Sequence, residues 1–369
     1  MTSRKENTMG NREEARLAFA RKYDWGNVQV HALPADASAR RYYRLEKPDG
    51  QSALIMDAPP EKEDVKPFVK VADHLCAQGF SAPRVLARDM EQGFLLLEDF
   101  GEGTYTRLLK NGHDEVALYR LATLCLAELH AKDNSAEIEV PPYDRTVLIR
   151  EALLLADWHF PAVRGDIMPD ALRQSYVSAW CSVFDSLKPQ QPQLVLRDFH
   201  VDNLMLLSGR DGVEACGLLD FQDALIGTAA YDVVSLLEDA RRDIEPALIE
   251  EMLESYIGFF ERQEPSSDSV IPFDPSAFMA WYRSYGVQRH CKVAGIFVRL
   301  AVRDGRDHYP VHIPRVVRLL ERGLADPVLL PVKAWFDTHY SDFQNDPVLS
   351  DRGRILELAQ KSEERGVMI

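Results

Sequence analysis

The stretch LRDFHVDN at 196–203 places two aspartates, a histidine, an arginine and an asparagine between two apolar runs. Asp198 and Asn203 are five residues apart, and Asp220 follows in the apolar segment GLLDF. Phosphoryl transfer to a hydroxyl group needs a carboxylate that accepts the hydroxyl proton, oxygen ligands for Mg²⁺, and positioning. Asp and Asn are also common in turns. The flanking apolar runs and Asp220 therefore favour the chemical interpretation, with Asp198 as base and Asn203 and Asp220 as metal ligands.

Two groups of elements must position these residues. Before residue 100, the pattern predicts a short helix at 11–24, strands at 28–33, 41–45 and 52–56, a helix at 65–79, and strands at 83–87 and 93–101. After Gly101, helical spacing predicts helices at 113–133, 146–160 and 169–187, strand-like runs within 194–221, and helices again from about 230. The first group suits an antiparallel sheet with one packed helix.

Composition excludes several classes of protein. The net charge of −15 argues against a general nucleic-acid binder. The start of the chain lacks the apolar core of a signal peptide, and no apolar run is long enough to span a membrane. The sequence contains no P-loop, GxGxxG, HExxH or CxxC motif. We expect a cytoplasmic protein with no membrane association and no obligate protein partner.

The segments RDFHVDNLMLL and GLLDFQDALIGTAAYDVVSLL resemble the catalytic core of the aminoglycoside phosphotransferase-like kinases. The positions that match this core are Asp198, His200, Asn203, Asp220, Gly227 and Asp232. Leu196 and Arg197 stand where that core usually has His and Gly. In the resemblance, Arg197, His200 and Asp232 are supporting residues.

Three flanking segments, DASARRYYRL, MDAPPEKED and VQRHCKVAGIFVRL, are similar to bacterial kinases that phosphorylate the anomeric hydroxyl of N-acetylmuramate and N-acetylglucosamine during cell-wall sugar recycling. This resemblance covers about residues 25–340 and implies ATP and Mg²⁺ as cofactors. It also implies an α+β, two-lobed protein-kinase-like fold. We expect a tail and helix at 1–24, a β-rich nucleotide-binding lobe at 25–101, a helical catalytic and sugar-binding lobe at 102–345, and a C-terminal tail or helix at 346–369.

Kinases of this fold hold the ATP phosphates with a lysine on the third strand, but the segment SALIMDAPP has none. Arg40 or Arg41 is the candidate replacement, and backbone amides near Ser38 are candidates to bind phosphate. The segment GFLLLEDFG resembles the hinge, where backbone groups of Glu98 and Phe100 would meet adenine. These five residues are the predicted nucleotide contacts, with surface ion pairing as the alternative for the arginines.

Candidate sugar contacts are Asp144, Asp223, Arg289 and His290. An arginine suits an acceptor with a carboxylate, although charge on a helix surface explains Arg289 and His290 equally well. Two other functions remain open. One is a phosphotransferase for another small hydroxyl compound, such as an aminoglycoside or a choline-like alcohol. The other is a pseudokinase-type binding module, which the missing strand lysine favours and the retained Asp198, Asn203 and Asp220 oppose.

Overall fold

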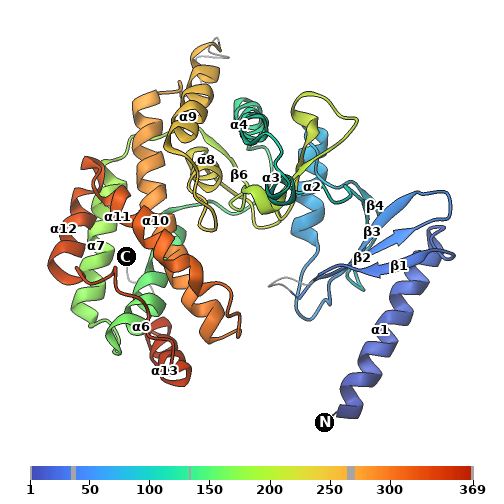
Figure 1. Cartoon of the computed structure of the whole chain (residues 1–369), viewed down its shortest axis with the longest axis horizontal. Helices are drawn as coiled ribbons and strands as arrows, with labels where there is room; N and C mark the ends of the chain where they lie inside the picture. Colours follow the sequence, from blue (N-terminus) through green and yellow to red (C-terminus); the bar gives the residue numbers. More distant parts are fainter. Residues whose placement is uncertain (1, 35–38, 133, 264–270, 367–369) are drawn as a thin grey trace. The chain divides into compact units, whose positions relative to one another are not determined.

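The computed structural model describes residues 2–34, 39–132, 134–263 and 271–366. The chain divides into two compact units, each built from two stretches that are separate in the sequence (Figure 1). Unit 1 comprises Met1–Leu129 and Val201–Ala224, and unit 2 comprises His130–His200 and Leu225–Ile369. The predicted lobe boundary near residue 101 falls inside unit 1, and the predicted functional lobes stay a prediction.

Unit 1 contains a five-stranded antiparallel sheet of strand order β1-β2-β3-β5-β4. Its elements are α1 (Thr2–Lys22), β1 (Gln29–Ala32), β2 (Arg41–Glu46), β3 (Ser52–Asp57), α2 (Lys66–Ala77), β4 (Val85–Asp89) and β5 (Phe94–Glu98). The predicted order of three strands, one helix and two strands is confirmed. Helix α1 begins earlier than the predicted helix at 11–24.

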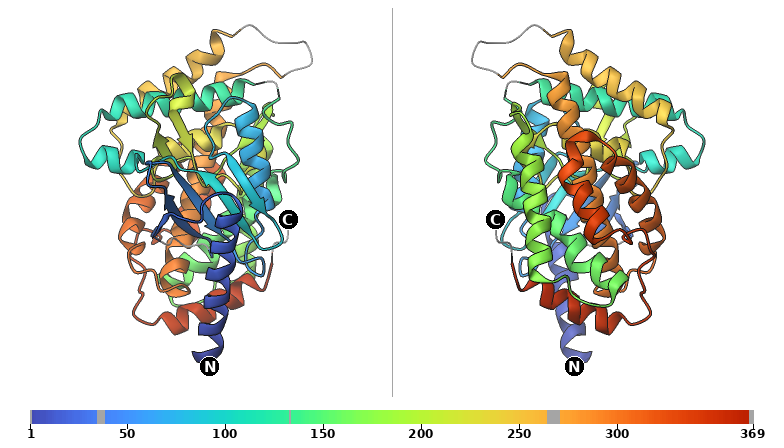
Figure 2. Two further views of the ribbon diagram at one scale, coloured as in Figure 1. Left: turned by 90° about the vertical axis from the view of Figure 1, so that its right-hand side faces the viewer. Right: turned by 90° about the vertical axis from the view of Figure 1, so that its left-hand side faces the viewer.

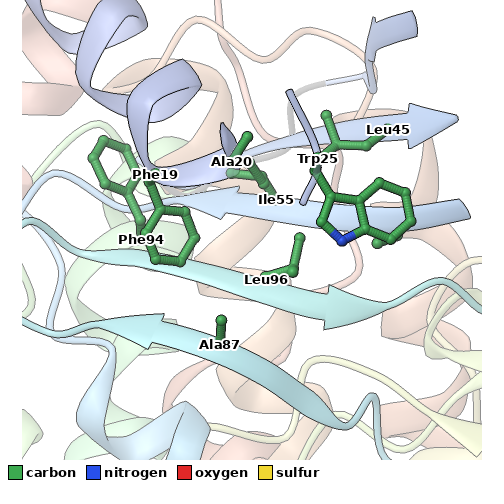
Figure 3. Close-up of a cluster of buried hydrophobic side chains, with 9 residues drawn as sticks. Phe19, Ala20, Trp25, Leu45, Ile55, Ala87, Phe94 and Leu96 are labelled. Atoms are coloured by element: carbon green, nitrogen blue, oxygen red, sulfur yellow. The ribbon is translucent and has the colours of Figure 1, made fainter. Parts of the chain in front are cut away.

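A hydrophobic cluster joins α1 to one face of this sheet (Figure 3). Phe19 stacks on Phe94 of β5, with ring centroids 5.8 Å apart. Phe94 and Leu96 belong to the cluster, whereas Leu95 and Leu97 are buried outside it. Since successive side chains of a strand point to opposite faces, β5 is buried on both faces, which explains its unbroken apolar run.

The rest of unit 1 includes the second stretch of the unit. Its elements are α3 (Tyr105–Lys110), α4 (Glu115–Ala131), a short turn at Val201–Asn203, β7 (Leu204–Leu206), a turn at Gly212–Ala215 and β8 (Cys216–Leu218). The amide of Leu218 donates to the carbonyl of Ser81 (2.7 Å), and the Ser81 hydroxyl donates to the carbonyl of Glu214 (2.6 Å). These bonds attach the β7–β8 ladder to the segment that precedes β4.

Unit 2 is mainly helical, as predicted. Its elements are α5 (Arg145–Leu154), a π-helical turn (Leu155–His159), α6 (Phe160–Arg164), α7 (Asp170–Ser186), β6 (Pro192–Val195), β9 (Leu225–Thr228), α8 (Ala230–Leu237), α9 (Pro246–Glu261), α10 (Pro275–Val302), α11 (Ile313–Leu324), α12 (Leu330–His339) and α13 (Arg352–Glu363). Strand β9, which pairs with β6, was not predicted. Among the described residues, no helix has the length and apolar character needed to cross a membrane.

Helix α10 is the central helix of unit 2 and packs against α5, α8 and α11 (Figure 2). Its contact with α5 is very close at Gly295, where an added Cβ would lie 2.1 Å from the carbonyl oxygen of Leu154. A side chain at this position would therefore push the two helices apart. The close approach fixes α5 and α10 as a pair.

Candidate active site

The loop that carries Asp198 follows β6 in unit 2 and is anchored by Asp232 of α8. The fully buried Asp232 carboxylate accepts hydrogen bonds from the amides of Leu196 (2.6 Å) and Arg197 (2.8 Å). Hydrogen bonds to an ionised acceptor are stronger than neutral ones. Asp232 thereby holds the backbone that immediately precedes Asp198, in keeping with its predicted supporting role.

Arg197 adopts a left-handed backbone conformation, with φ of 71°. For a residue other than glycine, such a conformation costs about 1–3 kcal/mol and persists only where the surroundings impose it. Asp232 accepts from the Arg197 amide, and the hydroxyl of Ser235 donates to the Arg197 carbonyl (3.2 Å). Arg289 donates to that hydroxyl (3.0 Å). The Arg197 guanidinium donates to Glu151 of α5. Contacts to both its backbone and its side chain thus hold this residue.

Asp198 itself is half-buried and lies in a tight turn. Its amide donates to the carbonyl of Leu196 (2.9 Å), and its own carbonyl accepts from the amide of His200 (3.1 Å). His200 is buried, with Arg241 Nη1 3.3 Å from its Nε2. Burial lowers the pKa of His200, which favours the neutral ring. A buried neutral imidazole suits the predicted supporting role of His200; the role of Asp198 as base stays a prediction.

Asn203 and Asp220, the predicted metal ligands, lie at one end of the β7–β8 ladder in unit 1. Leu204 pairs with Leu218, and the amide of Leu219 donates to the carbonyl of Asn203 (2.9 Å). Asp220 is therefore the next residue beyond this pair. Its φ is 56°, and 44% of its side chain is exposed.

The ligand types at this end of the ladder fit a magnesium ion, which prefers oxygen donors. Within the described residues, no group of three or more His, Cys, Asp or Glu side chains is arranged to hold a metal ion. A magnesium ion here would take the Asp220 carboxylate, the amide oxygen of Asn203 and oxygens of phosphates or water. This donor set matches a metal that binds together with a nucleotide.

The α3 region supports the ladder beside Asn203. The hydroxyl of Thr106 donates to the carboxylate of Asp202, and the amide of Leu206 donates to the carbonyl of Gly103 (2.8 Å). These bonds attach residues 202–206 to the start of α3. They position Asn203 from the side opposite to its pairing with Leu219.

Arg40 contacts the predicted metal ligand Asp220. Its Nη2 lies 3.3 Å from Oδ1 of Asp220, and 12% of the arginine side chain is exposed. Arg41 instead donates to the carbonyl of Arg40 (2.9 Å). Burial raises the pKa of Tyr42 to about 12, although Arg40 opposes the shift, so this neighbour stays neutral. Ser38, the third predicted phosphate contact, lies outside the described residues.

Glu98 and Phe100, the predicted hinge residues, lie together beside Arg210. The Arg210 guanidinium donates to the Glu98 carboxylate and lies 5.3 Å from the centre of the Phe100 ring. The amide of Glu98 donates to the carbonyl of Arg84 (2.9 Å). The side chains of Glu98 and Phe100 thus contact Arg210 within unit 1. Contact of their backbone groups with adenine stays a prediction.

The four predicted sugar contacts lie in different surroundings. Arg289 and His290 are buried on α10, and burial lowers the pKa of His290 to about 3. The exposed Asp144 caps the start of α5 by accepting from the amide of Val147 (3.0 Å). Asp223 belongs to unit 1, whereas the other three residues belong to unit 2. Arg289 is therefore not a surface charge, because it is buried and donates to Ser235, which in turn holds the Arg197 carbonyl. Sugar contact by any of the four residues stays a prediction.

Two charged residues next to Arg197, Glu151 of α5 and Lys292 of α10, were not predicted from the sequence. The buried Glu151 carboxylate accepts from Arg197 and from Lys292 Nζ (2.9 Å). Burial opposes its ionisation, but Lys292 and Arg197 outweigh burial and lower the pKa of Glu151 to about 2. The available signal was a lone acidic residue inside the apolar run LIREALLLA, because a buried charge requires partners.

The sequence profile of the phosphotransferase enzyme family matches residues 29–266, which is more than half of the chain. The chain belongs to the phosphotransferase enzyme family. This membership confirms the predicted resemblance and the predicted class of enzyme, an ATP-dependent phosphotransferase that acts on a hydroxyl group.

Two relatives of this phosphotransferase carry the same name, N-acetylmuramate/N-acetylglucosamine kinase. The protein from Caulobacter vibrioides is 33% identical over 362 residues, covering 89% of this chain and 96% of that protein. The protein from Neisseria meningitidis is 39% identical over 293 residues, covering 78% and 83%. A choline/ethanolamine kinase family structure from Mesorhizobium loti shares the fold, with a TM-score of 0.57 and 12% identity over 89% of this chain and 99% of that one. The predicted kinase-like fold class is confirmed.

Proposed function

We propose that this phosphotransferase is a sugar kinase that uses ATP to phosphorylate the anomeric hydroxyl of N-acetylmuramate and N-acetylglucosamine. The observation that carries the proposal is the similarity to kinases of that name over most of both chains. The product, a sugar 1-phosphate, would return cell-wall sugars to metabolism. The cytoplasm is the compartment that we propose for this reaction.

In the proposed reaction, Asp198 accepts the proton of the sugar hydroxyl as the hydroxyl oxygen bonds to the γ-phosphorus of ATP. The bond from that phosphorus to the β,γ-bridging oxygen breaks, and ADP leaves with the electron pair. An anomeric hydroxyl is more acidic than an ordinary alcohol, so a carboxylate is an adequate base when the proton moves late. The anchored backbone before Asp198 supports this role because a general base must be held in place.

We assign the phosphates of ATP to residues of unit 1. Asn203 and Asp220 would hold Mg²⁺, which neutralises developing charge on the phosphates when it is bound. Arg40 would replace the missing strand lysine, because its guanidinium already binds Asp220. A guanidinium that pairs with a carboxylate can pair with a phosphate oxygen in the same way.

An assay with several acceptors tests the proposal. Purified protein, ATP and MgCl₂ are combined with N-acetylmuramate, N-acetylglucosamine, an aminoglycoside or choline, and products are identified by ³¹P NMR. We expect anomeric phosphates of the two N-acetylated sugars, with the Asp198→Asn variant as the blank. Phosphorylation of the aminoglycoside or choline alone would reassign the acceptor. Absence of both turnover and any thermal shift with ATP and Mg²⁺ would favour a binding module.

A further inference from the structure

Arg197 and Lys292 form an ionic cluster with the buried carboxylate of Glu151 in unit 2, beside the residue proposed as base. The Glu151 carboxylate accepts hydrogen bonds from the Arg197 guanidinium, from Lys292 Nζ (2.9 Å) and from the hydroxyl of Tyr143. Lys292 also donates to the hydroxyl of Tyr231 (3.2 Å). The three charged residues come from α5, from the loop after β6 and from α10. The cluster therefore joins three segments that are far apart in the sequence.

The cluster contains two cations for one carboxylate. Burial disfavours charge on Glu151, yet the two cations lower its pKa to about 2. Burial opposes charge on Lys292 most strongly, and Arg197 repels it, but Glu151, Tyr231 and Asp198 together outweigh both effects and raise the pKa of Lys292. All three groups are thus charged at neutral pH. Loss of Glu151 would leave two largely buried cations, whose side chains are 20% and 12% exposed, without their shared partner, which is more costly than the loss of either cation.

The cluster acts on the catalytic loop through Arg197. This residue has a left-handed backbone, and Asp232 and Ser235 hold its backbone while Glu151 holds its side chain. Asp198 is the next residue, and its charge interacts with those of Arg197 and Lys292. A shift of the Arg197 side chain would therefore change both the position and the surroundings of the Asp198 carboxylate.

We propose that Glu151 and Lys292 are positioning residues for phosphoryl transfer. Glu151 holds Arg197, and with it the loop that carries Asp198, while Lys292 keeps Glu151 charged and in place. Neither residue contacts ATP or the sugar in this proposal. Its kinetic part rests on the proposed sugar kinase function, whereas its structural part stands without it.

The first test combines kinetics with hydrogen–deuterium exchange on the full chain. In Glu151→Gln, kcat is expected to fall about 100-fold while the KM for ATP stays within about 3-fold. Exchange of the amides at residues 196–200 should become about 10-fold faster because local opening is easier. The matched control is Asp157→Asn, which removes another buried carboxylate of unit 2, one that accepts from Arg173 and Ser362. That control should lower the melting temperature but leave kcat and exchange at 196–200 unchanged.

The second test uses the charge balance of the cluster. Lys292→Met leaves the pair of Glu151 and Arg197 intact, so its kcat should fall only about 10-fold, and Lys292→Arg should recover to within about 3-fold of wild type. The double variant, E151Q with K292M, removes one of the two uncompensated cations. It should therefore have a higher kcat and melting temperature than E151Q alone.

Three outcomes bear on the proposed positioning roles of Glu151 and Lys292. The proposal is overturned if Glu151→Gln matches Asp157→Asn in kcat and exchange, or if Lys292→Met costs more than Glu151→Gln, which would place Lys292 on a substrate. If Glu151→Gln does not fold, unchanged kcat and exchange in Lys292→Met overturn it. If the wild-type enzyme phosphorylates neither sugar, the proposed function fails, but the exchange comparison needs no substrate and still decides the positioning role.

Discussion

The residues predicted to act in phosphoryl transfer are held differently in the two units. In unit 2, the loop before Asp198 is fixed by the buried carboxylates of Asp232 and Glu151. In unit 1, Asp220 is 44% exposed, and its contacts include the side chains of Arg40 and Gln222. A base must be in place before the reaction, whereas metal and phosphate ligands must exchange partners as nucleotide arrives and leaves. From this difference we expect a pre-formed loop at Asp198 and an adaptable site at Asp220.

The strongest test of the pre-formed loop is Asp198→Asn, which keeps the shape of the side chain and removes the base. We expect kcat to fall by about 10³-fold, the contribution of a well-placed general base. ATP affinity, measured by calorimetry with MgCl₂, should stay at the wild-type value because the residues proposed to bind Mg²⁺ and phosphate are Asn203, Asp220 and Arg40. Near-wild-type turnover would contradict the assignment of Asp198.

The adaptable site is tested by Asp220→Asn, with Asp223→Asn as the matched control three residues away. Loss of the Asp220 carboxylate should lower kcat about 100-fold and raise the Mg²⁺ concentration needed for half-maximal rate. The control should keep the Mg²⁺ requirement within about 3-fold of wild type, and because Asp223 is a predicted sugar contact, its loss should act on the KM for the sugar instead. Equal losses in the two variants would show that the turn as a whole, rather than Asp220, is required.

Arg40→Met tests whether the arginine has the role of the missing strand lysine. We expect the KM for ATP to rise about 10-fold with a smaller change in kcat, because a phosphate contact is lost. Arg41→Met removes a guanidinium that donates to the carbonyl of Arg40 (2.9 Å), and it should change the KM for ATP by less than about 3-fold. The opposite ranking would assign the phosphates to Arg41.

The smallest effect is expected at Asp144, where a helix cap and a sugar contact are competing roles. Asp144→Ala should cost about 1 kcal/mol of stability because the cap of α5 is lost. Asp144→Ser preserves capping without the carboxylate, so it should keep wild-type stability. A raised KM for the sugar in the serine variant would support sugar contact, and an unchanged KM would leave the cap as the only role.

Local patterns predicted much of the fold. The strands at 41–45 and 52–56 and the helix at 65–79 were predicted because apolar periodicity and turn residues mark such elements directly. Strand β9 (Leu225–Thr228) was missed because four residues are too few to show a strand pattern and its partner β6 lies about thirty residues earlier. Short strands of this kind are defined by their partner rather than by their own sequence.

The candidate site was predictable where residues are close in sequence and not where charges meet across the chain. The spacing of Asp198, Asn203 and Asp220 is local enough to suggest their roles. The pairing of Glu151 with Lys292 joins positions 141 residues apart, and that of Arg40 with Asp220 spans 180. Such pairs depend on tertiary packing, which a single sequence does not reveal.

The division of each unit into two stretches has a consequence for folding during synthesis. The five-stranded sheet can form once residues up to Glu98 have left the ribosome. The hydrogen bonds of Ser81 form only later, because its partners lie at 210–218. The first half of unit 2 is translated in the meantime and must remain open until α10 arrives. A nascent chain paused between these points should expose to solvent the side chain of Ser81, which is buried in the folded protein.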